Sequence, residues 1–121
     1  MPIKKILVVD DSPTDRQYLG DLLVKSGFTV TTAESAEEAL VKVKEQRPDL
    51  VLMDVVMPGL NGFQATRTLS KDASTKDIPV IIVTTKGQET DRVWGMRQGA
   101  RDYIVKPVSV GDLLAKISAL G

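Results

Sequence analysis

The sequence predicts an α/β domain with three layers, in which an open parallel sheet carries helices on both faces. Five short apolar, β-branched runs recur along the chain, and helix-length segments separate them. Several runs are continuous rather than alternating in polarity, which is typical of strands covered on both faces. Strands that alternate with helices favour a parallel sheet joined by right-handed crossovers.

The five predicted strands are short and end close to polar residues. They are ILVV (6–9), FTVTTA (28–33), LVLM (50–53), PVIIVT (79–84) and DYIVK (102–106). The first, third and fourth are the unbroken apolar runs, so these three are expected to be buried on both faces.

Residues that favour helix ends mark the segments between the strands. In the segment SAEE, Ser35 stands at a predicted N-cap and Glu38 three residues later, which indicates a capping box. The other markers are Ser12, Pro13 and Gly27 around the first helix, and Gly99 and Ser109 at the end of the fourth helix and the start of the fifth.

Length and charge exclude several classes of protein. The chain has 121 residues, which is a single-domain length. Lysine plus arginine equals aspartate plus glutamate at 16 each, so no basic field for nucleic acid or an anionic membrane is expected. No stretch approaches the roughly 18 apolar residues of a membrane span. The sequence therefore predicts a cytoplasmic protein that contacts neither nucleic acid nor membrane directly.

Cysteine and histidine are both absent. Disulfides, thiolate metal sites, the common zinc sites and Ser-His-Asp hydrolases are therefore excluded. Any chemistry must use carboxylates, hydroxyls, lysines and arginines.

Polar residues stand where the predicted strands end. The first strand ends in Asp10 and Asp11, the third in Asp54, the fourth in Thr84 and the fifth in Lys106. Because parallel sheets bind ligands beyond the carboxyl ends of their strands, these side chains are expected to converge. Neighbouring carboxylates raise one another's pKa unless a cation neutralises them.

This residue set suits Mg²⁺ and a phosphoryl group. A few carboxylates with water filling the other positions fit Mg²⁺ better than Ca²⁺. Thr84 and Lys106 are the donors that phosphoryl oxygens need, and Asp54 is the candidate nucleophile. Taken singly, Asp10-Asp11 resembles a helix cap and Asp54 a turn residue. The combination at one edge favours a site.

Four motifs resemble the receiver domain of two-component response regulators, of the single-domain type similar to the chemotaxis regulator. They are VVDDS (8–12), DVVMPGLNG (54–62), VIIVTT (80–85) and GARDYIVKP (99–107). The resemblance covers essentially the whole chain. It implies a flavodoxin-like (βα)5 fold with strand order 2-1-3-4-5, and one domain over residues 1–121 without an effector domain.

The resemblance also implies a role for each site residue. Asp54 accepts a phosphoryl group from the phosphohistidine of a sensor histidine kinase. The Mg²⁺ ligands are Asp10, Asp11, Asp54 and the backbone carbonyl of Val56. No turnover of an outside substrate is implied, because the domain assists only its own phosphorylation and dephosphorylation.

A switch is implied by three further positions. Lys106 pairs with Asp54 or its phosphate and precedes a cis bond to Pro107, Thr84 bonds a phosphoryl oxygen, and Tyr103 moves inward. The switched surface is formed by the fourth helix, the fifth strand and the fifth helix. It is expected to control a downstream motility or signalling protein, with the chain acting as a monomer or weak dimer.

The segment at 83–108 most resembles the small receivers of type IV pilus chemosensory systems, which control twitching motility. Trp94 in this segment is either packed over the sheet edge or an anchor for a partner. Other readings stay open: a phosphate sink, a phosphorylation-independent scaffold, a carrier of flavin mononucleotide, or a phosphohydrolase. The phosphohydrolase would need a general acid where Val56 stands, and a flavin phosphate would face Asp10 and Asp11.

Overall fold

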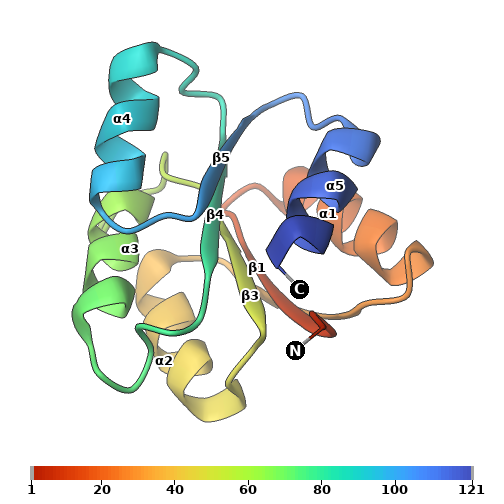
Figure 1. The fold of residues 1–121 in the computed structure, drawn as a ribbon, viewed down its shortest axis with the longest axis horizontal. Helices are drawn as coiled ribbons and strands as arrows, with labels where there is room; N and C mark the ends of the chain where they lie inside the picture. The colour runs from red at the N-terminus through yellow and green to blue at the C-terminus, as the bar shows by residue number, and fades with distance from the viewer. Residues whose placement is uncertain (1, 121) are drawn as a thin grey trace.

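The computed structural model describes residues 2–120 and shows a five-stranded parallel sheet between two layers of helices (Figure 1). The strand order is β2-β1-β3-β4-β5, as predicted. The elements are β1 (Lys5–Val9), α1 (Pro13–Lys25), β2 (Thr29–Ala33), α2 (Ala36–Gln46), β3 (Leu50–Met53), α3 (Gly62–Lys71), β4 (Val80–Thr84), α4 (Glu89–Arg97), β5 (Asp102–Val105) and α5 (Val110–Leu120).

Each predicted strand is present, with small differences at the ends. Phe28 and Pro79 lie just before β2 and β4 rather than inside them, and Lys106 follows β5. Proline lacks the N–H that a central strand such as β4 requires, so the strand begins at the next residue.

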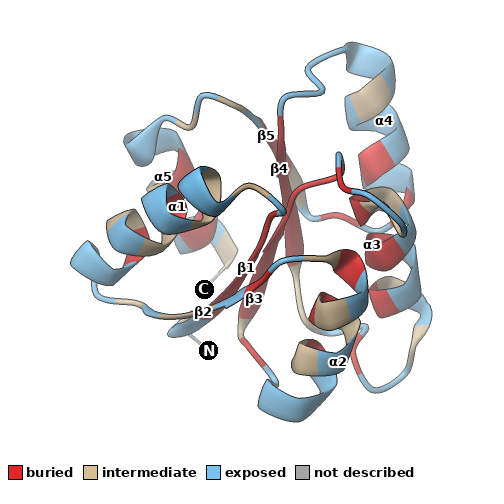
Figure 2. Cartoon of the chain, turned by 180° about the vertical axis from the view of Figure 1, so that it is seen from behind, coloured by how far each residue is buried: buried red, intermediate tan, exposed pale blue. Residues whose placement is uncertain are grey.

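The sheet buries both of its faces, which explains the continuous apolar runs (Figure 2). Helices α1 and α5 cover one face, while α2, α3 and α4 lie on the other (Figure 1). Alternate residues of β1 serve the two sides: Ile6 and Val8 pack with Leu23 of α1, whereas Leu7 and Val9 pack with Val43 of α2.

Helix capping agrees with the sequence at Ser12 and differs in one detail at Ser35. The Ser35 hydroxyl accepts a hydrogen bond from the Glu38 N–H at 3.1 Å, as predicted. The Glu38 carboxylate, however, accepts from the N–H of Glu34 at 2.7 Å. The predicted capping box at Ser35 is therefore wrong in its second half, because the side chain of Glu38 reaches one residue further back.

Helix α3 begins directly against the backbone of the strand that carries Asp54. A Cβ atom added to Gly62 would lie 2.0 Å from the Asp54 carbonyl oxygen. The helix start is fixed by a capping box in which Asn61 accepts from the Gln64 N–H at 2.9 Å and Gln64 accepts from the Asn61 N–H at 3.0 Å. Only glycine permits this approach, so Gly62 helps to set the position of Asp54.

Replacing Gly62 with alanine should destabilise the fold by about 2 kcal/mol or more, because the new methyl group collides with backbone that cannot move aside cheaply. Urea denaturation measures the free energy of unfolding. Gly111→Ala is the matched control, since Gly111 lies in α5 with nothing near its Cβ direction. That variant should be unchanged or slightly stabilised. Equal stability of the two variants would contradict the prediction.

Candidate functional site

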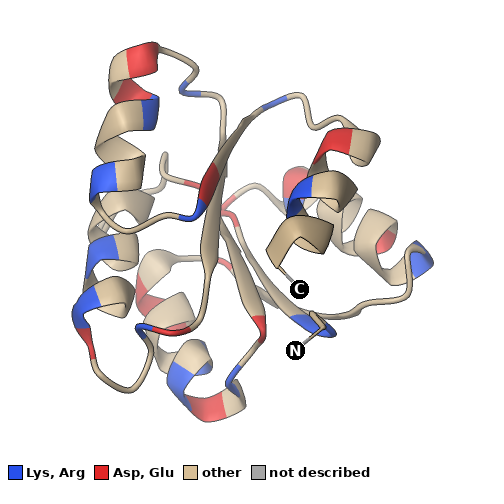
Figure 3. Cartoon of the chain, viewed as in Figure 1, with Lys and Arg blue, Asp and Glu red and all other residues tan. Residues whose placement is uncertain are grey.

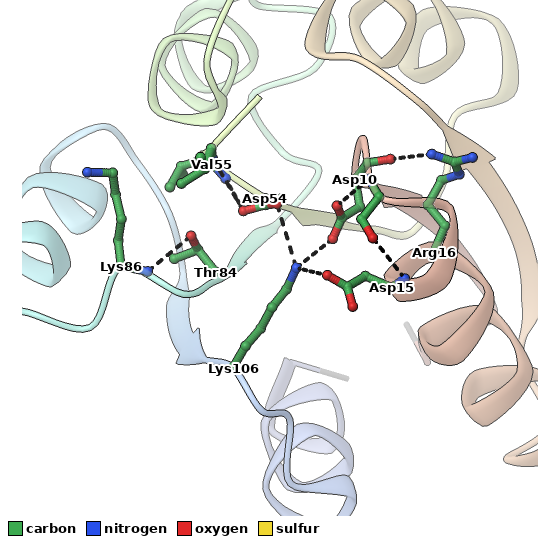
Figure 4. Close-up of polar contacts among 10 residues, drawn as sticks. Asp10, Asp15, Arg16, Asp54, Val55, Thr84, Lys86 and Lys106 are labelled. Carbon is green, nitrogen blue, oxygen red and sulfur yellow. Dashed lines mark hydrogen bonds and ion pairs between the residues drawn. The ribbon is translucent and has the colours of Figure 1, made fainter. Parts of the chain in front are cut away.

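The carboxyl ends of four strands bring the predicted site residues together (Figure 4). Asp10 follows β1, Asp54 follows β3, Thr84 ends β4 and Lys106 follows β5. Backbone hydrogen bonds hold the two acids at this edge: the Asp10 N–H donates to Ala33 at 3.1 Å and the Asp54 N–H donates to Val9 at 3.0 Å. The predicted convergence is present.

Lys106 is the cation at the centre of the site (Figure 4). Its Nζ lies 2.7 Å from Asp10 Oδ2 and 2.8 Å from Asp15 Oδ2. The third carboxylate, that of Asp54, is 3.6 Å away, which makes an ion pair but not a hydrogen bond. The bond between Lys106 and Pro107 is cis, as the resemblance implied.

Asp15 is the site residue that sequence reasoning missed. In the sequence it looks like an ordinary acidic residue in the first turn of α1, where a negative charge interacts favourably with the helix dipole. Its one signal is its place four residues after Asp11, on the first turn of the helix that leaves the site. Only the structure shows that its carboxylate meets Lys106 from β5.

The environment of Asp54 favours its neutral form. The side chain is buried, and its Oδ1 accepts hydrogen bonds from the N–H groups of Val55 at 2.7 Å and Val56 at 3.3 Å. Burial and then the charge of Asp10 raise the pKa of the Asp54 carboxyl, while Lys106 opposes them. When Asp54 is ionised, the protein alone therefore balances its negative charge only in part.

Lys106 is held firmly in its charged form. Burial lowers the pKa of its ammonium group, but hydrogen bonds to Asp10 and Asp15 and the charge of Asp54 raise it by more. The pKa lies above the ordinary lysine value, so Lys106 is positively charged at every physiological pH.

The acidic residues fit a hard divalent cation. One carboxylate oxygen from each of Asp10, Asp11 and Asp54 lies within 4.8 Å of the other two. Asp11 is exposed while the other two are buried, so a bound ion would have protein on one side and water on the other. This donor set is typical of Mg²⁺. The Val56 carbonyl stays a predicted ligand.

The backbone of Lys86 is hydrogen bonded to two other predicted site residues, Thr84 and Tyr103. Its backbone N–H donates to Thr84 Oγ1 at 3.3 Å, and its carbonyl accepts from the hydroxyl of Tyr103 at 2.6 Å. Tyr103 is buried, and burial followed by the charges of Asp91 and Asp54 raises the pKa of its phenol to about 12.

The ring of Tyr103 lies inward beneath α4. A Cβ atom on Gly95 would be 3.1 Å from two of its ring carbons, so α4 packs closely over the ring. Trp94 of the same helix is 52% exposed, so its side chain is not part of the core.

A family model described as the response regulator receiver domain matches residues 6–118, and the chain belongs to that family. Receiver domains take phosphoryl groups from histidine kinases and bind Mg²⁺ at an acidic pocket. The fold, its strand order and the resemblance seen in the sequence are thereby confirmed.

Several relatives are similar over the whole receiver. The chain is 59% identical to Protein PilH of Pseudomonas aeruginosa over 96% of both chains. It is 40% identical to the phosphate regulon transcriptional regulatory protein PhoB of Escherichia coli. That match covers 97% of this chain and 51% of PhoB. Among solved structures, chemotaxis protein CheY4 of Vibrio cholerae matches with a TM-score of 0.90 at 31% identity, covering 98% and 99% of the two chains.

The chain thus spans nearly all of PilH and about half of PhoB. Within residues 2–120 no helix is long and apolar enough to cross a membrane. In the view of Figure 3, both acidic and basic residues occur on the helices and loops.

Asp54→Asn should make the metal-free protein more stable at pH 7, by a few degrees in Tm. The raised pKa means that ionising Asp54 costs folding free energy above the ordinary carboxyl pKa, and asparagine avoids that cost. The gain should vanish below about pH 4, where the carboxyl is protonated in both states.

Thermal unfolding across this pH range, with and without Mg²⁺, measures both effects. Added Mg²⁺ should raise the Tm of the wild type more than that of Asp54→Asn, because the ion binds the native carboxylate. Asp21→Asn, an exposed change on α1, is the charge-matched control. A lower Tm for Asp54→Asn at pH 7 without metal would contradict the prediction.

Proposed function

We propose that this chain is a switch that accepts a phosphoryl group on Asp54 from a sensor histidine kinase. The observation that carries the proposal is the gathering of Asp10, Asp11 and Asp54 around one edge of the sheet with Lys106 among them. Membership of the receiver family supports the same chemistry.

Of the two buried acids, Asp54 is the proposed acceptor, because Lys106 stays outside hydrogen-bond distance of its Oδ2. Both oxygens of Asp10 are occupied, one by the Ser12 N–H at 2.9 Å and one by Lys106 at 2.7 Å. Asp54 Oδ1 accepts two backbone N–H groups, whereas Oδ2 lies 3.6 Å from Lys106 Nζ, outside hydrogen-bond distance. Oδ2 is therefore the nucleophilic atom.

In the reaction, Asp54 Oδ2 forms a bond to phosphorus as the bond from phosphorus to the histidine nitrogen of the kinase breaks. The electron pair of the broken bond stays on that nitrogen, which takes up a proton. Asp10, Asp11 and Asp54 would hold Mg²⁺, which would supply electrostatic stabilisation of the phosphoryl oxygens. Lys106 and the hydroxyl of Thr84 provide donors on the protein side.

Phosphorylation replaces the Asp54 carboxylate with a group that carries a charge of roughly −1.5 to −2 and places new acceptor oxygens next to Thr84. When Thr84 turns its hydroxyl toward them, its bond with the Lys86 N–H changes. The Lys86 carbonyl holds the Tyr103 hydroxyl, so the change passes to the ring under α4. In this way the site biases the surface formed by α4, β5 and α5.

That surface is the proposed contact for a downstream motility or signalling protein. Val93 and Met96 of α4 and Val105 of β5 are exposed apolar side chains there. The 59% identity to PilH supports a role in type IV pilus or chemotaxis-like signalling. We further propose that the receiver domain acts in the cytoplasm as a monomer or weak dimer that does not bind nucleic acid or membrane.

Turnover of an outside phosphomonoester is not part of this function. A hydrolase with an aspartyl-phosphate intermediate needs a group that can donate a proton near the nucleophile. Val56 stands two residues after Asp54 and is 49% exposed, but its side chain carries no proton to donate.

Incubation with a small phosphodonor and Mg²⁺ should give one phosphoryl adduct by intact mass. The adduct should be lost in Asp54→Asn and when Mg²⁺ is chelated, because each removes part of the acceptor site. Asp21→Asn should be labelled like the wild type. An adduct that persists in Asp54→Asn would overturn the assignment of the acceptor.

A histidine kinase from a type IV pilus chemosensory system should phosphorylate the chain at least about tenfold faster than a kinase of an unrelated pathway, which corresponds to about 1.4 kcal/mol of transition-state preference. Time courses with radiolabelled kinases measure the two rates side by side. Equal rates with both kinases would count against the proposed pathway while leaving the acceptor site intact.

A further inference from the structure

We propose that Asp15 is a positioning residue that holds Lys106 back in the unphosphorylated protein and gives it up when Asp54 is phosphorylated. The proposal rests on the proposed function, because it concerns how the same site changes state. Asp15 lies outside the motifs that carry the resemblance and outside the predicted ligand set.

The distances show how the ammonium group is shared. Lys106 Nζ has three hydrogens; the bonds at 2.7 Å to Asp10 and 2.8 Å to Asp15 use two of them. Asp54 Oδ2 is 3.6 Å away, beyond hydrogen-bond distance. The two acids at the start of the chain thus hold the ammonium away from the acceptor carboxylate.

Burial decides which bond is exchanged. The side chain of Asp10 is 2% exposed, so its carboxylate has no water to replace Lys106. The side chain of Asp15 is 45% exposed, and water can solvate it once Lys106 leaves. Movement of Lys106 toward a phosphoryl group on Asp54 therefore breaks the bond to Asp15 and keeps the bond to Asp10.

The molecule has room for this exchange. A hollow of about 290 Å³ lies beside the pair and is also lined by Tyr18, Leu19 and Pro107. The Asp15 and Lys106 side chains can separate there without displacing the core.

Two opposite effects on ligand binding follow from this arrangement. In the unphosphorylated protein, Asp15 adds negative charge near the cation site and keeps Lys106 from competing for Asp54, so it favours Mg²⁺. With a phosphoryl group present, Asp15 repels that group and competes with it for Lys106, so it disfavours the phosphorylated state.

A purely structural role for Asp15 predicts something else. Asp15 is the third residue of α1, where a negative charge stabilises the helix through its dipole. Its loss would then lower the Tm slightly but would not move the two affinities in opposite directions.

The test is calorimetric titration of Asp15→Asn with Mg²⁺ alone, and with beryllium trifluoride anion at saturating Mg²⁺ as the phosphoryl mimic. We expect Mg²⁺ to bind about threefold more weakly and the mimic about threefold more tightly than in the wild type. The effects are small because the ion pair between Asp15 and Lys106 is partly exposed to water. Asp15→Glu keeps the carboxylate and should restore both affinities toward the wild type.

Asp21→Asn is the matched control, because it removes one exposed carboxylate from the same helix, away from Lys106. Identical affinities for Asp15→Asn and Asp21→Asn would overturn the proposal, as would shifts of both ligands in the same direction. Failure of the wild type to bind the mimic would instead overturn the proposed function, and this inference with it. Opposite shifts found only in Asp15→Asn would establish it.

Discussion

The structure depends on negative charge held at a buried edge of the sheet. Asp10 and Asp54 are both buried and lie close to Asp11, so like charges meet where the surroundings screen them poorly. Lys106 reaches Asp10 and Asp54 from the far side of the site. One ammonium group cannot balance three carboxylates, and the negative charge that is left suits a divalent cation such as the Mg²⁺ that receiver domains bind.

The acids cannot relieve this charge by moving apart. Asp10 and Asp54 leave strands whose backbones are hydrogen bonded to their neighbours, and Gly62 brings α3 directly against the Asp54 carbonyl. Any change of charge must therefore be met by groups that can move. Three groups can move in this way: the side chain of Lys106, the half-exposed carboxylate of Asp15 and the hydroxyl of Thr84. Lys106 and Asp15 contact each other, and Thr84 contacts the backbone of Lys86.

The strands and several helix ends could be predicted because each depends on nearby residues. Unbroken apolar runs identify the buried strands, and Ser12 and Ser35 bond within their own first turns. The contact between Asp15 and Lys106 spans 91 positions, and no local pattern indicates it. The hydrogen bond that the Glu38 carboxylate accepts depends on the exact path of the chain before the helix, so the spacing alone predicted the wrong donor.

The contacts of Lys86 could not be predicted from the sequence either, because its backbone rather than its side chain makes them. Its N–H faces Thr84 and its carbonyl faces Tyr103, so one peptide segment contacts both the charged edge and the ring beneath α4. Tyr103 has little space to tilt while Gly95 lies against it. In the proposed switch, a change at Thr84 would therefore shift this loop and the ring together, since tightly packed contacts of this kind have few intermediate positions.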